Sequence, residues 1–108
     1  MAFTTIWIYP WDLHDEGTER VLDLLSGEGE LDAVSLAVSY HSFIALRPHL
    51  AGRKWLSAEG ASYFKPRLEL YDRTPIKPLV SPLVNEEDVL RNVSNYCQNH
   101  ELGLIAWT

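Results

Sequence analysis

The chain has 108 residues, 46% of them hydrophobic and 22% charged, which is typical of one small globular domain rather than a disordered tail. Its formal net charge of -6 disfavours nucleic acid and anionic membrane surfaces as partners. A single Cys97 rules out an intrachain disulfide, and no apolar run is long enough to span a bilayer. The first Lys or Arg is Arg20, so the start lacks the basic region of a secretory signal. We therefore expect one cytoplasmic domain over residues 1–108.

The first predicted element is a strand over residues 3–9 (FTTIWIY), which is β-branched, aromatic and bounded by Pro10. Apolar residues at successive positions are typical of a strand that is buried on both faces. A helix is predicted from about Glu16 to Leu25, with Asp15 or Asp12 as its cap. Residues 26–29 (SGEG) are expected to end it.

A second buried strand is predicted over residues 33–40 (AVSLAVSY), followed by a polar cluster. The connection over residues 43–84 is long and holds five of the six prolines. Within it, residues 53–57 and 61–65 flank a short turn that contains Gly60, which predicts a β-hairpin over about 53–65.

A second helix is predicted from about Glu86 to Glu101, where Asn85 and Asp88 form an imperfect capping box. Its apolar face is expected to comprise Val89, Val93, Tyr96 and Cys97. Gly103 suits the left-handed position after the helix, and residues 104–108 (LIAWT) form a third predicted strand.

This alternation of strands and helices predicts a parallel sheet with right-handed crossovers. We expect an α/β fold, namely a partial parallel (β/α) barrel of about three βα units with the hairpin inserted after the second strand. A full barrel needs about 250 residues, so an apolar sheet edge should remain for another chain or further sequence to cover.

Aromatic and polar residues follow each predicted strand, where parallel α/β folds bind ligands. Tyr9, Trp11 and Asp12 follow the first strand, Tyr40 and His41 the second, and Trp107 lies at the third. Aromatic rings can stack on the C–H faces of a sugar while a carboxylate and an imidazole bind its hydroxyls. These residues are therefore predicted to line a carbohydrate subsite. The alternative is that the tryptophans are core residues and that Asp12 caps the first helix.

Arg47 and His49 follow shortly after His41 and are expected either at the same rim or, for Arg47, in a solvated loop. Asp12, His14, His41 and His49 have side chains that can ligate a divalent metal, but their spacing fits no known ligand signature. We therefore predict neither a metal nor a cofactor. The acidic residues 86–88 suit a helix start rather than a glycosidase dyad. No nucleotide-binding loop, GxSxG or HExxH motif occurs.

Four segments together resemble the N-terminal third of an uncharacterised bacterial family of glycoside-hydrolase-like (β/α)8 barrels: residues 7–13 (WIYPWDL), 32–42 (DAVSLAVSYHS), 47–49 (RPH) and 80–84 (VSPLV). The resemblance implies a barrel whose catalytic carboxylates follow later strands, around the fourth and seventh. It implies substrate-rim roles for Asp12, Tyr40, His41 and His49, and it supplies no catalytic acid or nucleophile.

Three functions remain open from the sequence. The first is a fragment of such a barrel that holds part of a carbohydrate-binding rim and has no turnover by itself. The second is a stand-alone, oligomerising interaction module that uses the sheet edge and the aromatic residues Trp55, Tyr63 and Phe64. The third is a metal-dependent hydrolase or isomerase fragment that uses Asp12, His41 and His49. The expected partners are a carbohydrate and either a second copy or the remainder of a longer barrel chain.

Overall fold

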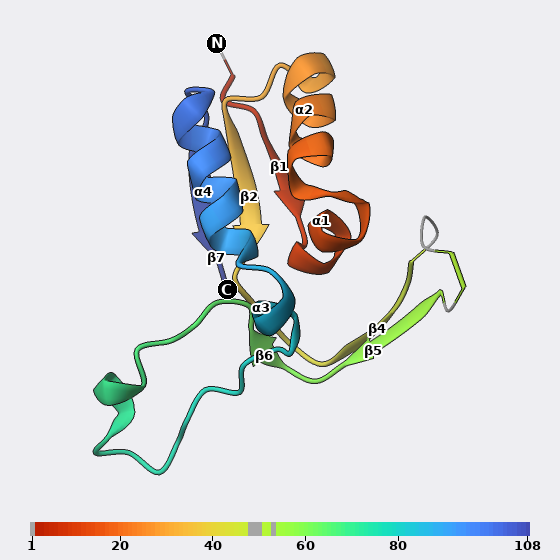
Figure 1. The fold of residues 1–108 in the computed structure, drawn as a ribbon. Coiled ribbons are helices and arrows are strands. Elements are labelled where there is room, and N and C mark those ends of the chain that lie inside the picture. The colour runs from red at the N-terminus through yellow and green to blue at the C-terminus, as the bar shows by residue number, and fades with distance from the viewer. Residues whose placement is uncertain (1, 48–50, 53) are drawn as a thin grey trace.

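The computed structural model describes residues 2–47, 51–52 and 54–108. Its centre is a parallel sheet of β1 (Thr5–Ile8), β2 (Ala33–Ala37) and β7 (Gly103–Trp107), in the order β1-β2-β7 (Figure 1). The chain crosses from β1 to β2 through α2 (Thr18–Gly29) and reaches β7 through α4 (Val89–Asn99). The prediction of parallel pairing is confirmed, and the first two predicted strands are neighbours in the sheet. Within the described residues, the sheet does not close into a barrel.

Helices α2 and α4 pack against each other over one face of this sheet. Val34 and Leu36 of β2 project into the core on that face, because alternate residues of a strand share a side. Residues from both helices complete the core, and α4 contributes the predicted face of Val89, Val93, Tyr96 and Cys97, all of them buried. The apolar period of α4 was therefore a reliable guide to its buried side.

Among the described residues, no helix covers the second face of the sheet, which is lined by small residues along β2. Ala33, Ser35 and Ala37 are nevertheless buried, and beside Ser35 and Ala37 the rings of Trp7 and Trp107 approach to 4.6 Å between centroids from the two outer strands. The prediction that the first strand is buried on both faces is wrong, since the Trp7 side chain is 64% exposed. Its apolar run was consistent with double burial, but the described part of the chain supplies no second layer over this face.

The first helical region differs from the expected single helix. It comprises α1 (Pro10–Glu16) and α2, which are separated by Gly17 at a φ of 93°. Proline suits the first turn of a helix because its missing N–H would be unpaired there, so the helix starts at Pro10. Asp12 lies within the first turn of α1 rather than at a cap, and α2 continues through Gly27 to Gly29.

The second helical region also divides in two. A short α3 (Leu83–Glu86) precedes α4, and the Asp88 carboxylate caps α4 by accepting a bond of 3.1 Å from the Arg91 amide. The left-handed residue after α4 is Glu101, at a φ of 55°, and not Gly103. Gly103 instead begins β7, where a Cβ would lie 3.1 Å from the Cβ of Ala33. Glycine therefore favours the close approach of β7 to β2 at this point.

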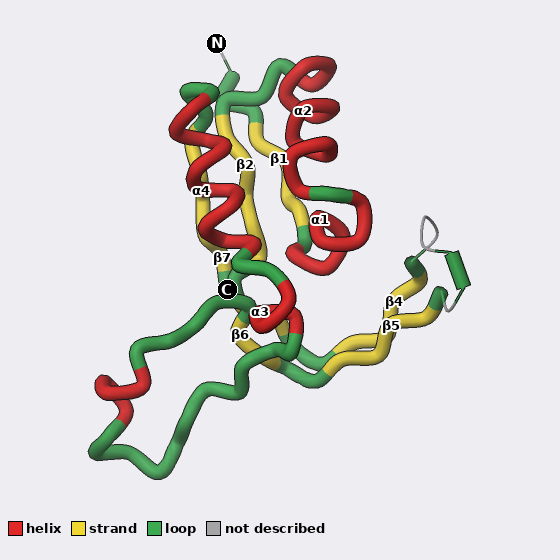
Figure 2. The backbone as a smooth tube through the Cα atoms, viewed as in Figure 1, coloured by secondary structure: helices red, strands yellow, loops and turns green. Residues whose placement is uncertain are grey.

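The predicted hairpin pairs differently from the expectation. Strand β3 (Ser39–Tyr40) pairs with β6 (Ala61–Ser62), and β4 (Phe43–Leu46) pairs with β5 (Trp55–Ala58), both antiparallel. The two pairs follow one another along one two-stranded ribbon, formed by residues 39–46 and 55–62, which passes beside α1 and extends beyond it (Figures 1 and 2). Gly60 does not reverse the chain. Its amide donates to Ser42 Oγ at 2.9 Å and it sits between β5 and β6 along one side of the ribbon.

A long loop over residues 63–82 leaves and re-enters the ribbon base, carrying only a 3₁₀ turn, η1 (Leu68–Tyr71). A parallel bridge between Ser62 and Val80 joins its two ends, and the Ser81 amide donates to the Ser62 carbonyl at 2.9 Å. Among the described residues, none of the helices has both the length and the apolarity needed to cross a membrane.

Candidate functional site

The carboxyl ends of the three parallel strands carry a cluster of aromatic rings. Tyr9, which follows β1, contacts Tyr40 and Trp107 with ring centroids 5.2 and 6.1 Å apart, and Tyr40 and Trp107 are 5.9 Å apart. The cluster exists because the parallel register of β1, β2 and β7 places their last residues at one sheet edge. Three of the residues predicted to share a site are therefore neighbours.

Trp11 lies in the interior of this cluster and is only 7% exposed. Tyr9 stacks on it at 4.7 Å and 9° between planes, while Phe43 of the ribbon stacks on it at 4.3 Å and 26°. Because both ring faces carry aromatic neighbours, Trp11 offers no broad face to a sugar. The position of Trp11 therefore favours a core role over the sugar-stacking role. As a core residue, Trp11 attaches the ribbon to α1.

An open cavity of about 490 Å³ adjoins the cluster, and we call it the strand-end hollow. Its walls comprise residues 39–41, 61–62, 78–79 and 107–108, so Tyr40, His41 and Trp107 face it together. Tyr9, Trp11 and Asp12 are not part of its lining. The structure thus brings together three of the predicted substrate-binding residues at one concave surface.

The polar groups of the hollow are an imidazole and hydroxyls. His41 is exposed, and its Nδ1 lies 2.8 Å from the Ser42 carbonyl. Since a carbonyl only accepts, Nδ1 carries the proton and Nε2 is left to accept a hydrogen bond when the ring is neutral. The indole Nε1 of Trp107 donates to the Ser35 carbonyl at 3.1 Å, which holds the ring in place. The described lining includes no Asp or Glu side chain.

The Tyr9 hydroxyl lies 3.5 Å from that of Tyr40, at the long limit for a hydrogen bond. This contact, together with burial and the nearby charge of Asp12, raises the pKa of Tyr9. Tyr9 therefore remains a neutral phenol at physiological pH and does not act as a base.

The two remaining residues of the predicted rim are Asp12 and His49. Asp12 is partly buried near Tyr9. His49 lies outside the described residues.

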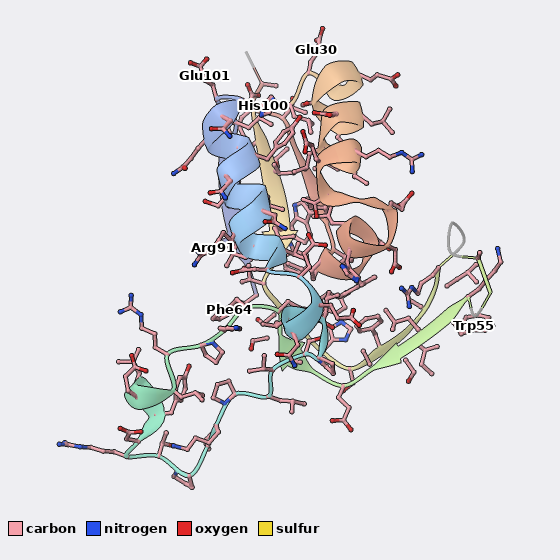
Figure 3. All side chains as sticks on the ribbon, viewed as in Figure 1. Glu30, Trp55, Phe64, Arg91, His100 and Glu101 are labelled. Atoms are coloured by element: carbon pink, nitrogen blue, oxygen red, sulfur yellow. The ribbon has the colours of Figure 1, made fainter. Side chains whose placement is uncertain are left out.

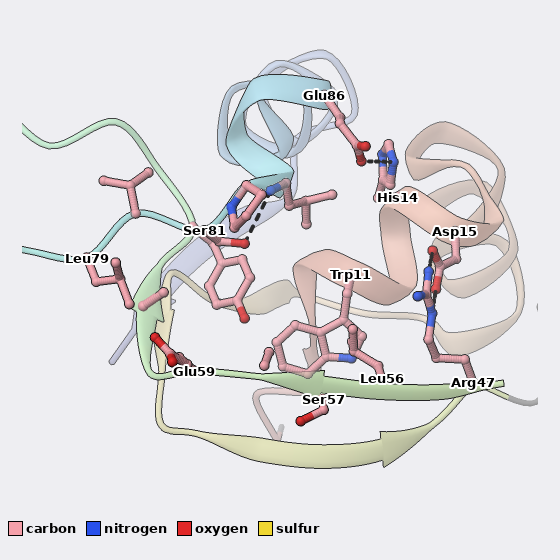
Figure 4. A pocket seen from close by; sticks show the side chains of 16 residues that line it. Trp11, His14, Asp15, Arg47, Leu56, Ser57, Glu59, Leu79, Ser81 and Glu86 are labelled. Carbon is pink, nitrogen blue, oxygen red and sulfur yellow. Dashed lines mark hydrogen bonds and ion pairs between the residues drawn. The ribbon is translucent and has the colours of Figure 1, made fainter. Parts of the chain in front are cut away.

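Arg47 forms a different contact from either of those expected. Its guanidinium binds the Asp15 carboxylate through two nitrogens, with Nε donating to Oδ2 at 2.6 Å. The Asp15 side chain is 9% exposed and that of Arg47 21%. This pair joins the end of β4 to α1 and forms one end of a second cavity, the ribbon cleft, which lies between α1, residues 56–63 and residues 79–86 (Figure 4).

His14 lies at another part of the ribbon cleft, between two carboxylates. Its Nδ1 is 2.8 Å from Glu87 Oε1 and its Nε2 is 3.1 Å from Glu86 Oε2. Burial tends to raise the pKa of Glu87, but hydrogen bonds from His14, Thr18 and Asn92 outweigh it, and the pKa is lowered. This network ties α1 and α2 to the start of α4.

Within the described residues, no group of three or more His, Cys, Asp or Glu side chains is arranged to hold a metal ion. His14 faces the glutamates, and His41 lies at the strand-end hollow. The metal-dependent alternative, which also required His49, gains no support from the arrangement of these residues.

The polar walls of the ribbon cleft could not be identified from the sequence. Asp15, Arg47 and Glu86 are brought together by the folding of the ribbon and of α3 against α1, and nothing in their local spacing indicates this. The sequence shows only that Arg47 has a charge opposite to that of Asp15 and Glu86, and many other pairs of residues in the chain also have opposite charges.

Comparison of the chain with protein-family models, with curated proteins and with solved structures yields no match.

Proposed function

We propose that the strand-end hollow is a carbohydrate-binding subsite on a segment of a parallel α/β barrel. The observation that carries this proposal is that Tyr40, His41 and Trp107, which come from strands distant in sequence, line one open cavity at the carboxyl end of the parallel sheet. Ligands of parallel α/β folds bind at this end of the strands.

The partial-barrel part of the proposal is supported by the layering. Helices α2 and α4 cover one face of the sheet, whereas a doubly wound fold covers both faces. In a barrel, the helix-free face is the interior and is filled by side chains of other strands. The small residues along β2, with Trp7 and Trp107 over them, suit that position.

Binding can be tested by titrating the protein with mono- and disaccharides while following tryptophan fluorescence. We expect saturable binding at about millimolar concentrations, a free energy near 4 kcal/mol. The change should be lost in Trp107→Phe and weakened in His41→Ala. Trp55→Phe is the matched control, because Trp55 is 63% exposed and lies at the far end of the ribbon (Figure 3). A flat titration, or a signal that disappears with Trp55 rather than Trp107, would contradict the proposal.

We further expect no glycoside hydrolysis by this chain. Both common glycosidase mechanisms require two carboxyl groups that flank the scissile bond, and the described lining of the hollow has none. Release of nitrophenol from aryl glycosides measures this directly. Turnover that disappears in Asp12→Asn would show that Asp12 is catalytic and that the expectation is wrong.

Self-association is a second candidate function, favoured by one specific observation. Ile44, Leu46 and Trp55 are 73, 54 and 63% exposed, and the register of β4 with β5 places them on one face of the ribbon. Tyr63 and Phe64, which were expected to contribute, do not, since Tyr63 is buried and Phe64 packs against the core. An exposed apolar ribbon face is typical of an interaction surface.

Sedimentation velocity at tens of micromolar concentrations tests this second candidate. A dimer or larger oligomer is expected, with Trp55→Ser or Leu46→Ser shifting the population to monomer. Leu70→Ser is the control, because Leu70 is even more exposed, at 74%, but lies in the long loop. A clean monomer for the unmodified chain excludes the ribbon as a self-association surface.

A further inference from the structure

The ribbon cleft has the size and lining of a small-molecule site. Its volume is about 510 Å³, within the usual range of about 300–1,000 Å³ for such sites. Four separate parts of the chain form it: α1, Arg47 after β4, residues between 56 and 63, and residues between 79 and 86 (Figure 4). It is distinct from the strand-end hollow, although Ala61 and Leu79 contribute to the walls of both.

Apolar groups form most of the cleft walls. Trp11 and Tyr63 contribute aromatic rings to the lining, and Leu56 and Leu83 are among its aliphatic side chains. Burial raises the pKa of Tyr63, although a hydrogen bond from Ser81 opposes this, so its phenol is neutral. The cleft can therefore accept a ring or a short hydrocarbon chain of a ligand.

The charged groups of the cleft leave an excess of negative charge. Asp15 and Arg47 neutralise one another in their ion pair. His14 lies between Glu86 and Glu87, so even an imidazolium there leaves one carboxylate unbalanced.

Glu59, in the short connection between β5 and β6, adds another carboxylate, and it forms no ion pair with any residue in the described part of the chain. The whole chain is also acidic, with a formal net charge of -6, which attracts cations to the cleft.

We propose that the ribbon cleft binds a small organic cation, a protonated amine that carries an aromatic or aliphatic body. The ammonium group binds Glu59 or Glu86 at the cleft wall, and the body lies against Trp11, Tyr63 and Leu83. Charge-assisted hydrogen bonds orient the amine, while burial of the body supplies most of the affinity. An anion of the same shape is repelled.

The probe for the test is 2-phenylethylammonium, with phenylacetate and 2-phenylethanol as anionic and neutral compounds of similar shape. Titrations are followed by amide chemical shifts in ¹⁵N-labelled protein. We expect saturable shifts at Ser57, Glu59, Leu83 and Glu86, with little change at His41 and Trp107. Affinity should follow the order cation, neutral, anion, and should fall as salt is raised, because salt screens the carboxylates.

Glu59→Gln and Glu86→Gln should each weaken binding of the cation by about two- to fivefold, as expected for a partly exposed charge pair, and leave the neutral compound unaffected. Glu69→Gln, at an exposed acid of η1 outside the cleft, is the matched control. Ala58→Phe, which places a ring in the cleft, should abolish binding while the circular dichroism spectrum is retained.

Equal affinity for phenylacetate, an absence of saturable shifts, or an equal effect of the Glu69 variant would each overturn the proposal. Shifts confined to His41 and Trp107 would also overturn it and would assign the amine to the strand-end hollow. Failure of sugar binding at that hollow leaves this result unaffected, because the variants that define the two sites are different.

Discussion

The two halves of this molecule use apolar residues in opposite ways. In the body, formed by the parallel sheet with α2 and α4, the large aliphatic residues Leu22, Leu36 and Val93 are at most 1% exposed. In the ribbon and the long loop, Ile44, Leu70 and Ile76 are each more than 70% exposed. The body therefore has a core of its own, whereas the ribbon and the loop contribute few buried residues and are held by contacts with the body.

That attachment rests on a few specific contacts. Phe43 stacks on Trp11, the Tyr63 amide donates to the Val38 carbonyl at 2.8 Å, and Arg47 binds Asp15. An isolated two-stranded ribbon is marginal in water, so these contacts decide whether it stays ordered. Both cavities lie along this junction, which places the candidate sites where a stable scaffold meets a weakly held segment.

The largest effect should come from truncating the core of the body. Leu22→Ala, in α2, is expected to lower the free energy of unfolding by about 2–5 kcal/mol, because it removes packed methyl groups and leaves a cavity. Leu24→Ala in the same helix, where Leu24 is 59% exposed, and Leu46→Ala in the ribbon should each cost less than about 0.5 kcal/mol. Urea denaturation measures all three. A large loss from Leu46 would show that the ribbon contributes to the core.

A smaller effect is expected where β2 and β7 approach closely. Gly103→Ala should cost about 1–3 kcal/mol, since its Cβ would lie 3.1 Å from that of Ala33 and force the strands apart. The double variant Ala33→Gly, Gly103→Ala should recover part of this loss. Gly27→Ala is the control, because no atom lies within 4 Å of the added Cβ inside α2, and it should be neutral or stabilising. An unchanged denaturation midpoint for Gly103→Ala would contradict the close approach.

Asp15→Asn should act mainly on the ribbon. Removing the carboxylate leaves the Arg47 guanidinium without its partner, and we expect local opening of β4 and β5 to become easier by about 1–2 kcal/mol. Amide hydrogen exchange should accelerate in the ribbon and stay unchanged in α4. Asp72→Asn, at an exposed residue of the long loop, is the control. Equal acceleration in α4 would mean that ribbon and body unfold together.

The smallest effect concerns pH. Because the folded pKa of Glu87 lies below its ordinary value of 4.5, its carboxylate stabilises the fold fully above that value. The contribution is lost as pH falls through the lower, folded pKa. Denaturation midpoints should therefore decrease between about pH 5 and pH 3, and Glu87→Gln should reduce this decrease. Exposed Glu69→Gln is the matched control, and an identical pH profile for both variants would contradict the role of the His14–Glu87 network.

Local patterns in the sequence were sufficient for the βαβαβ order and for the buried face of α4. They also located the residues at strand ends, because parallel pairing follows from that order, and Tyr40, His41 and Trp107 share one cavity, whereas the equally predicted Tyr9, Trp11 and Asp12 do not line it. They were insufficient for Trp11. A tryptophan after a strand suits a binding rim as well as a core, and only the position of Phe43 shows that its second face is covered.

The ribbon register could not be derived from local sequence either, since residues 43–46, 55–58 and 61–65 are all short segments that can pair, and Gly60 suits a turn as well as an irregularity. Tertiary contacts selected the pairing, through the stacking of Phe43 on Trp11 and the burial of Tyr63. The same holds for the ribbon cleft, whose charged side chains come together only when the ribbon and α3 pack against α1.

The sequence by itself determined which segments are strands and helices of the body, because hydrophobic periodicity is a local property. Tertiary structure alone decided the pairing of the ribbon and the makeup of both cavities, because these depend on contacts between residues far apart in the chain.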